Sequence, residues 1–76
     1  MKVYVLTCVN ECSEIVSIDL FLTHAQARSR MEENFQAECE DLEKRRHLDY
    51  EKIEHSKAEC GDSEYYYSWE IHTREL

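Results

Sequence analysis

Residues 23–47 read THAQARSRMEENFQAECEDLEKRRH and contain no glycine, no proline and no long run of β-branched side chains. Thr23 and Gln26 have the spacing of a capping box, a side-chain arrangement that closes the start of a helix. The stretch therefore predicts one amphipathic helix from Thr23 to about Arg46. Its apolar stripe recurs at helical steps of three, four and seven residues, at Ala27, Met31, Phe35, Glu38/Cys39 and Leu42.

Two strands are expected before this helix. Residues 2–9 and 14–21 are rich in β-branched and aromatic side chains, and the polar segment 10–13 separates them, which is typical of a β-hairpin. The hairpin loop favours a register with Val9 opposite Glu14 and Val5 opposite Ile18. One face of the hairpin then carries the aliphatic residues Val3, Val5, Val16, Ile18 and Leu20.

Two further strands are expected after the helix. Residues 50–60 and 64–74 flank Gly61-Asp62-Ser63, which is a turn sequence. The last strand alternates cleanly, with Tyr65, Tyr67, Trp69 and Ile71 in one phase. Residues 50–60 change phase between His55 and Ala58, which indicates a bulge or an edge position in that strand.

The predicted fold class is α+β. The element order is ββαββ, with one long helix packed on one face of a four-stranded sheet, and residues 1–76 form a single domain. The first and last strands carry apolar residues in both phases, as central strands do. We therefore expect the strand order 2-1-4-3 with strands 1 and 4 parallel, and the alternative is an all-antiparallel sheet in the order 2-1-3-4.

The formal net charge is −8, from seventeen acidic and nine basic side chains. A surface of this charge repels phosphate groups, so direct binding to nucleic acid or to an anionic membrane is disfavoured. The apolar run at residues 3–9 is too short for a signal peptide or a membrane span, which favours a cytoplasmic location with reduced thiols. The expected partner is another protein or a second copy of the chain.

One helix covers only one side of a sheet. In the predicted register Tyr4, Leu6, Cys8 and Ile15 lie on the opposite side, and Tyr66 of the last strand joins them. Because a contiguous exposed apolar patch usually marks an interface, we predict a protein-binding surface at Tyr4, Leu6, Ile15 and Tyr66. The alternative is that long charged side chains or residues 47–52 cover these groups.

Cys8 and Cys12 have a spacing found in zinc sites, with Cys39, Cys60, His55 and His72 as further candidate ligands. No second pair of matching spacing completes the motif, so neither a metal nor a cofactor is expected. A small metal- or thiol-dependent regulatory protein that uses Cys8 and Cys12 is the alternative function. With a single glycine the chain builds no phosphate-binding loop, and no nucleophile is paired with a base in sequence, so we predict no enzyme activity.

Acidic side chains cluster at Glu32-Glu33 and in residues 38–43 of the predicted helix. A solvated helix face is the simplest interpretation. The alternative is a negative strip that imitates a nucleic-acid backbone and binds the basic groove of a partner protein.

Three segments carry a resemblance: MKVYVLT at residues 1–7, THAQA at 23–27 and YYYSWEIHTREL at 65–76. In these the chain resembles small uncharacterised acidic proteins of gut bacteria and of their phages or mobile elements. The resemblance implies an accessory protein of a kind that includes inhibitors of host defence. The predicted function is therefore a non-catalytic protein-interaction module, a phage-type inhibitor or adaptor that acts through its open sheet face or its acidic helix.

Overall fold

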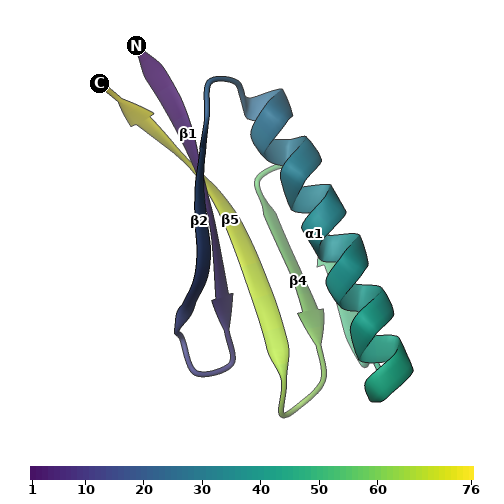
Figure 1. The fold of residues 1–76 in the computed structure, drawn as a ribbon. Coiled ribbons are helices and arrows are strands. Elements are labelled where there is room, and N and C mark those ends of the chain that lie inside the picture. The colour runs from purple at the N-terminus through teal and green to yellow at the C-terminus, as the bar shows by residue number, and fades with distance from the viewer.

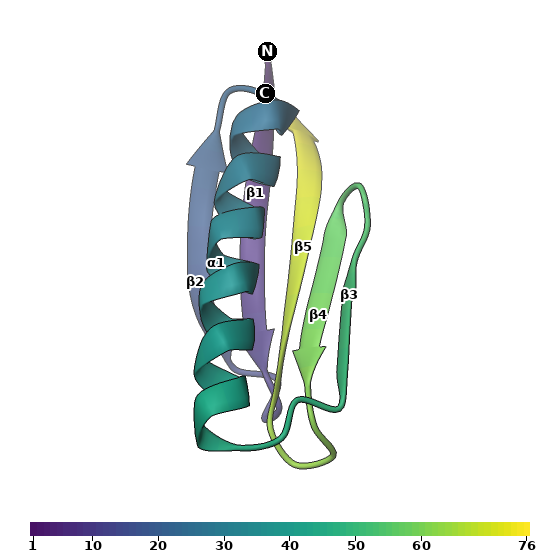
Figure 2. The ribbon, with the colours of Figure 1, turned by 90° about the vertical axis from the view of Figure 1, so that its right-hand side faces the viewer.

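A computed structural model describes residues 1–76, the whole of the sequence. The α+β class is confirmed, but the sheet has five strands, and the elements are β1 (Lys2–Asn10), β2 (Ile15–Phe21), α1 (His24–Arg45), β3 (Tyr50–Ile53), β4 (Lys57–Gly61) and β5 (Tyr66–Glu75). All neighbouring strands are antiparallel, in the order β2-β1-β5-β4-β3. Figures 1 and 2 show α1 lying along one face of this sheet and leaving the other face uncovered.

Helix α1 forms as its sequence predicts. Thr23 is the N-cap, and its side-chain oxygen accepts a hydrogen bond of 3.1 Å from the backbone N–H of Gln26. Lys44 and Arg45 lie in the last turn, where positive charge complements the negative end of the helix dipole. The predicted apolar stripe is confirmed, with Ala27, Met31, Cys39 and Leu42 buried and Phe35 packed against them.

The β1–β2 hairpin has a register two residues away from the predicted one. Val5 pairs with Leu20 and Thr7 with Ile18, and a bulge separates the Cys8 pair from the Val9 pair. The physical reason is a wider turn, in which the side chain of Asn10 accepts hydrogen bonds from the backbone N–H groups of Cys12 and Glu14. A shift of two residues keeps every side chain of the paired region on its face, because side chains alternate with a period of two.

The predicted third strand is in fact two strands. β3 and β4 form a hairpin whose turn lies at residues 54–56, and the backbone N–H of Glu54 donates to the carbonyl of Lys57 at 2.7 Å. The turn contains no glycine or proline, which are the residues that usually mark a turn in sequence. It explains the change of phase between His55 and Ala58.

Because of the additional strand, the last strand runs in the opposite direction to the one predicted. The predicted neighbours 2-1-4-3 correspond to the observed β2-β1-β5-β4, but the first and last strands are antiparallel, with Leu6 opposite Ile71. An extra hairpin reverses the direction in which the chain enters β5. The all-antiparallel alternative was correct about direction and wrong about which strands are neighbours.

The core lies between α1 and the sheet. Trp69, Leu6, Met31 and Cys60 are its largest fully buried side chains, and Ala58 of β4 gives the helix room to approach. The two ends of the chain meet beside one another, because the backbone N–H of Leu76 donates to the carbonyl of Met1 at 2.7 Å (Figure 1). The single helix is not apolar enough over its length to cross a membrane.

Candidate docking surface

Two of the four predicted binding residues lie on the helix side of the sheet and not on its uncovered face. Leu6 is completely buried under α1, and Tyr4 packs against the same core. The expectation that these residues are open to a partner is therefore wrong. The other two, Ile15 and Tyr66, are outside this core cluster.

The helix covers this side of β1 because of the side chains that β5 contributes. In the antiparallel pairing Leu6 lies opposite Ile71 and Cys8 opposite Trp69, so the largest apolar side chains of both strands point the same way. Burying an indole removes more apolar surface from water than burying the valines of the opposite face. If the first and last strands are paired antiparallel, the sequence positions of Trp69 and Ile71 indicate which face of β1 the helix covers.

The uncovered face carries the other phase of β1 and β2. Ile18 is 57% exposed and Leu20 is 68% exposed, and they pair with Thr7 and Val5 of β1. Ile15 pairs with Val9 beyond the bulge and is also exposed. Neighbouring residues opposite one another on paired strands share a face, so these side chains form one continuous surface. We call it the aliphatic strip, and it consists of Val3, Val5, Val9, Ile15, Ile18 and Leu20.

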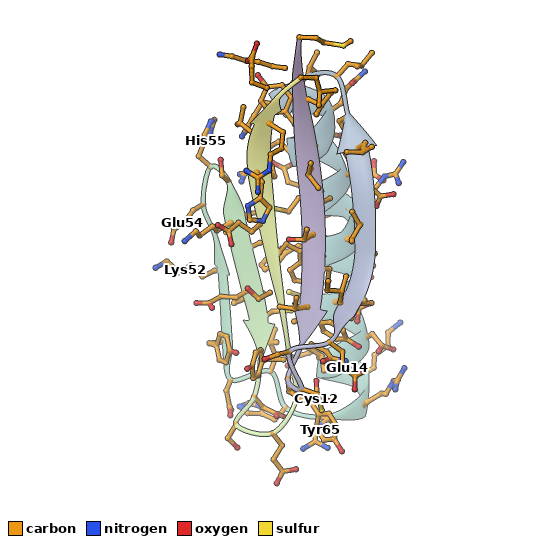
Figure 3. All side chains as sticks on the ribbon, turned by 90° about the vertical axis from the view of Figure 1, so that its left-hand side faces the viewer. Cys12, Glu14, Lys52, Glu54, His55 and Tyr65 are labelled. Atoms are coloured by element: carbon orange, nitrogen blue, oxygen red, sulfur yellow. The ribbon has the colours of Figure 1, made fainter.

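The other half of the uncovered face is charged, and its charges balance. Lys57 of β4 lies opposite Glu70 of β5, and Lys52 of β3 lies opposite Glu59. Lys52 Nζ is also 3.0 Å from Glu54 Oε1 at the outer margin, where Figure 3 labels both residues. Arg74 lies opposite Val3 on the same face, and Glu54, in the turn after β3, borders the same hollow as Lys52 and Lys57. The face and its margin thus carry three basic and three acidic side chains: Lys52, Lys57, Arg74, Glu54, Glu59 and Glu70.

A polar seam separates the two halves. Thr7 Oγ1 lies 3.3 Å from His72 Nε2 and also donates to the carbonyl of Glu70 at 3.4 Å. Both residues lie on the phase of their strand that points away from α1. The seam satisfies polar groups internally, so the adjoining aliphatic strip borders groups that already have partners.

The four cysteines do not form a cluster around Cys8 and Cys12, the pair whose spacing resembles that of zinc sites. Cys8 is buried under the helix and Cys12 is exposed in the β1–β2 turn. Burial, together with the Glu38 carboxylate, raises the pKa of Cys8 to about 11, and burial also raises the pKa of Cys39 and Cys60. These three thiols therefore stay protonated at neutral pH and behave as small apolar core groups. The structure contains no group of three or more His, Cys, Asp or Glu side chains placed to hold a metal ion.

Two histidines stack where α1 begins. The rings of His24 and His55 lie 4.2 Å apart and nearly parallel, and Tyr4 meets His24 edge-on. His24 Nε2 is 3.0 Å from the hydroxyl of Ser56. Burial, and then the nearby His55 and Arg28, lower the pKa of His24. This serine–histidine contact has the reach of a nucleophile and base, but no carboxylate orients the imidazole and none of the surface hollows includes the pair.

An ion-pair network that the sequence did not indicate joins the end of α1 to the β4–β5 turn. Arg46 Nε donates to Asp62 Oδ2 at 2.7 Å and its terminal nitrogen donates to Glu64 at 3.1 Å. The guanidinium also lies over the ring of Tyr65, 4.3 Å from its centre. Arg46 and Asp62 are sixteen residues apart in the sequence. No local sequence pattern therefore predicts their ion pair.

The acidic helix face is partly neutralised by the helix itself. Arg28 pairs with Glu32 and Arg45 with Asp41, one turn apart in each case. Residues 24–45 contain six acidic and four basic side chains, a net of −2 out of the −8 of the whole chain. Most of the negative charge therefore lies outside the helix, which weakens the nucleic-acid-mimic interpretation.

The hollows on the surface are shallow and open to solvent. One with a volume of about 440 Å³ lies between the end of α1 and the starts of the β1–β2 turn and β5, and its lining includes Glu11, Asp41, Arg45 and Tyr65. Small-molecule sites are typically enclosed and mostly apolar, and this hollow is neither. Comparison of the chain with protein-family models, with curated proteins and with solved structures gives no match.

Proposed function

We propose that this chain is a non-catalytic protein-interaction module that binds another polypeptide through the uncovered face of its sheet. The observation that carries the proposal is the aliphatic strip, in which Ile18 and Leu20 are more than half exposed beside the valines of β1. Contiguous exposed apolar surface on a soluble domain usually marks an interaction site.

The shape and charge of this face favour a protein over other ligands. The face is a sheet surface whose hollow, of about 240 Å³, is open to solvent and lined by charged side chains such as Lys52 and Glu59. An apolar area beside a polar one is common in protein interfaces. A chain with a net charge of −8 repels the phosphates of nucleic acids and of anionic lipids. Direct binding to nucleic acid or to membranes is therefore not part of the proposal.

The chemistry of the side chains supports a non-catalytic role. The three core thiols are held protonated by burial, and the Ser56–His24 contact has neither an orienting acid nor a substrate pocket. The alternative of a metal- or thiol-dependent regulator that uses Cys8 and Cys12 receives no support from the placement of these residues, one in the core and one in a turn.

The test is a comparison of two matched variants of the tagged protein as bait in a lysate of the cells that encode it. The face variant Ile18→Lys with Leu20→Lys adds two positive charges to the aliphatic strip. The control variant Gln36→Lys with Glu40→Gln adds the same charge on exposed positions of α1. We expect the parent and the control to recover the same partner in stoichiometric amount and the face variant to lose it. Equal recovery by both variants would refute the proposal.

A further inference from the structure

Resting on this proposed function, we infer that the polypeptide that covers the uncovered face is a second copy of this chain, packed sheet on sheet around a two-fold axis. A two-fold pairing requires a surface that is complementary to itself, because each residue of one copy meets the symmetry-related region of the other. The argument rests on the charge of the face, on its area and on the position of the aliphatic strip.

The charge of the face suits a copy of itself better than a basic partner. The face carries three acidic and three basic side chains, whereas the chain as a whole carries −8, so the entire excess lies on other surfaces. A strongly basic partner would be attracted to those other surfaces. A neutral face with an apolar half meets no net repulsion from an identical face.

The area of the face suits a weak, transient dimer. Five strands about 4.8 Å apart, with a mean length of about seven residues at about 3.3 Å each, give a face of roughly 550 Å². Two copies together would then bury about 1,100 Å², which clears the roughly 1,000 Å² of a biological interface but is below the roughly 1,200 Å² at which stable interfaces begin. We therefore expect a dimer that dissociates on dilution.

The position of the strip determines the orientation of the two copies. The strip lies on β1 and β2, at one side of the sheet, so when the two faces overlap over their whole area, strip meets strip if the two-fold axis runs across the strands. The strands of the two copies are then antiparallel across the interface, as in aligned sheet packing. The charged half of each face then meets the charged half of the other copy, and its equal numbers of basic and acidic side chains leave no net repulsion there.

A dimer of this kind also adds to a small core. The monomer buries ten hydrophobic residues in its core cluster, and chains of this length often gain stability from self-association. Because association stabilises only the folded state, the unfolding midpoint of a dimer rises with protein concentration.

Sedimentation of the purified chain from about 1 µM to about 500 µM tests the inference. The parent is expected to change from a species of 9.2 kDa to one of twice that mass. Ile18→Thr with Leu20→Thr keeps side chains that favour strands and removes apolar bulk from the strip, and it should weaken the dimer by about 100-fold. The control variant Gln36→Lys with Glu40→Gln should associate like the parent.

Three results would overturn the inference. A parent that stays at 9.2 kDa over the whole range excludes the dimer. If the threonine variant dimerises like the parent, the dimer uses another surface. The same conclusion follows if only the helix control variant weakens the dimer. The lysate comparison separates this failure from failure of the proposed function. If the parent is a monomer, and only the lysine face variant loses a partner in the lysate, the uncovered face still binds a protein, but that protein is not a second copy.

Discussion

Asp62 connects the β4–β5 turn to the end of α1. Its Oδ1 accepts hydrogen bonds from the backbone N–H groups of Glu64 and Tyr65, at 2.8 and 2.7 Å, and its Oδ2 pairs with Arg46. One carboxylate thus shapes the β4–β5 turn and ties it to the residue that ends α1. The side chain is only slightly exposed, so solvent competes little for these bonds.

Replacing Asp62 with Asn should change both the stability and its dependence on pH. The Arg46 guanidinium and the two backbone N–H groups lower the pKa of Asp62 from 3.8 to about 2. A pKa that is lower in the folded state stabilises the protein above about pH 4, and this contribution disappears as the pH falls toward 2. We expect Asp62→Asn to have a lower thermal midpoint at pH 7 and a flatter profile between pH 4 and pH 2.

Thermal unfolding followed by circular dichroism from pH 2 to pH 7 measures this difference. Glu64→Gln is the matched control, since Glu64 contacts the same guanidinium from a position that is 70% exposed, where ion pairs contribute little. A profile for Asp62→Asn that is parallel to that of the parent would contradict the assignment.

At the scale of elements, the β4–β5 hairpin requires its glycine. Gly61 has a φ of +155°, and a Cβ built on it would collide with the carbonyl oxygen of Tyr65 and with Cβ of Tyr66. The backbone of β5 therefore passes directly over this position. The carbonyl of Gly61 also accepts from the N–H of Asp49, which joins the end of the helix connection to the sheet.

We expect Gly61→Ala to lower the free energy of unfolding by about 3 kcal/mol, because backbone strain and a steric clash act together. Denaturation in urea measures it. Ser63→Ala, in the same connection and exposed, should change the stability by less than about 0.5 kcal/mol. A small effect of Gly61→Ala would mean that this hairpin relaxes more easily than its close packing implies.

The helix, the first hairpin and the last strand were predictable because each has a local pattern. Thr23 and the apolar stripe determine α1, and the alternation that ends in Trp69 and Ile71 determines β5. The β3–β4 turn was missed because residues 54–56 contain none of the glycine or proline that usually marks a reversal. That single omission also reversed the predicted direction of β5.

Exposed apolar side chains on the uncovered face were predicted, but most of the residues named for them were the wrong ones. β1 is apolar in both phases, so its sequence alone does not decide which phase meets the helix. The decision comes from β5, whose partner residues depend on strand direction, a property of the whole sheet. Tyr4 and Leu6 were therefore assigned to the wrong side, and Ile18 and Leu20 of the aliphatic strip were assigned to the core.

At the scale of the whole molecule, the core places three of the four cysteines out of reach of solvent. Cys8, Cys39 and Cys60 are buried and Cys12 is exposed. A thiolate must form and must be accessible before it reacts with a disulfide reagent. We expect one thiol to react in the native protein and four in denaturant, as counted by absorbance of the released chromophore.

Cys12→Ser provides the control for this count, since it should leave no fast thiol in the native protein. Rapid reaction of two or more thiols in the folded parent would show that the helix does not seal the core. A native count that falls on addition of zinc, and is restored by a chelator, would instead revive the metal-dependent alternative for Cys8 and Cys12.

The two outer strands of the sheet differ in a way that limits how copies can polymerise. β2 is a seven-residue edge strand with five apolar side chains, whereas β3 at the opposite edge has four residues and carries Glu51 and Lys52. A filament that grows edge to edge through hydrogen-bonded strands would need β3, as well as β2, to pair with a strand of another copy. Short, charged edge strands oppose such pairing, so the β3 margin disfavours edge-to-edge growth of the sheet from that side.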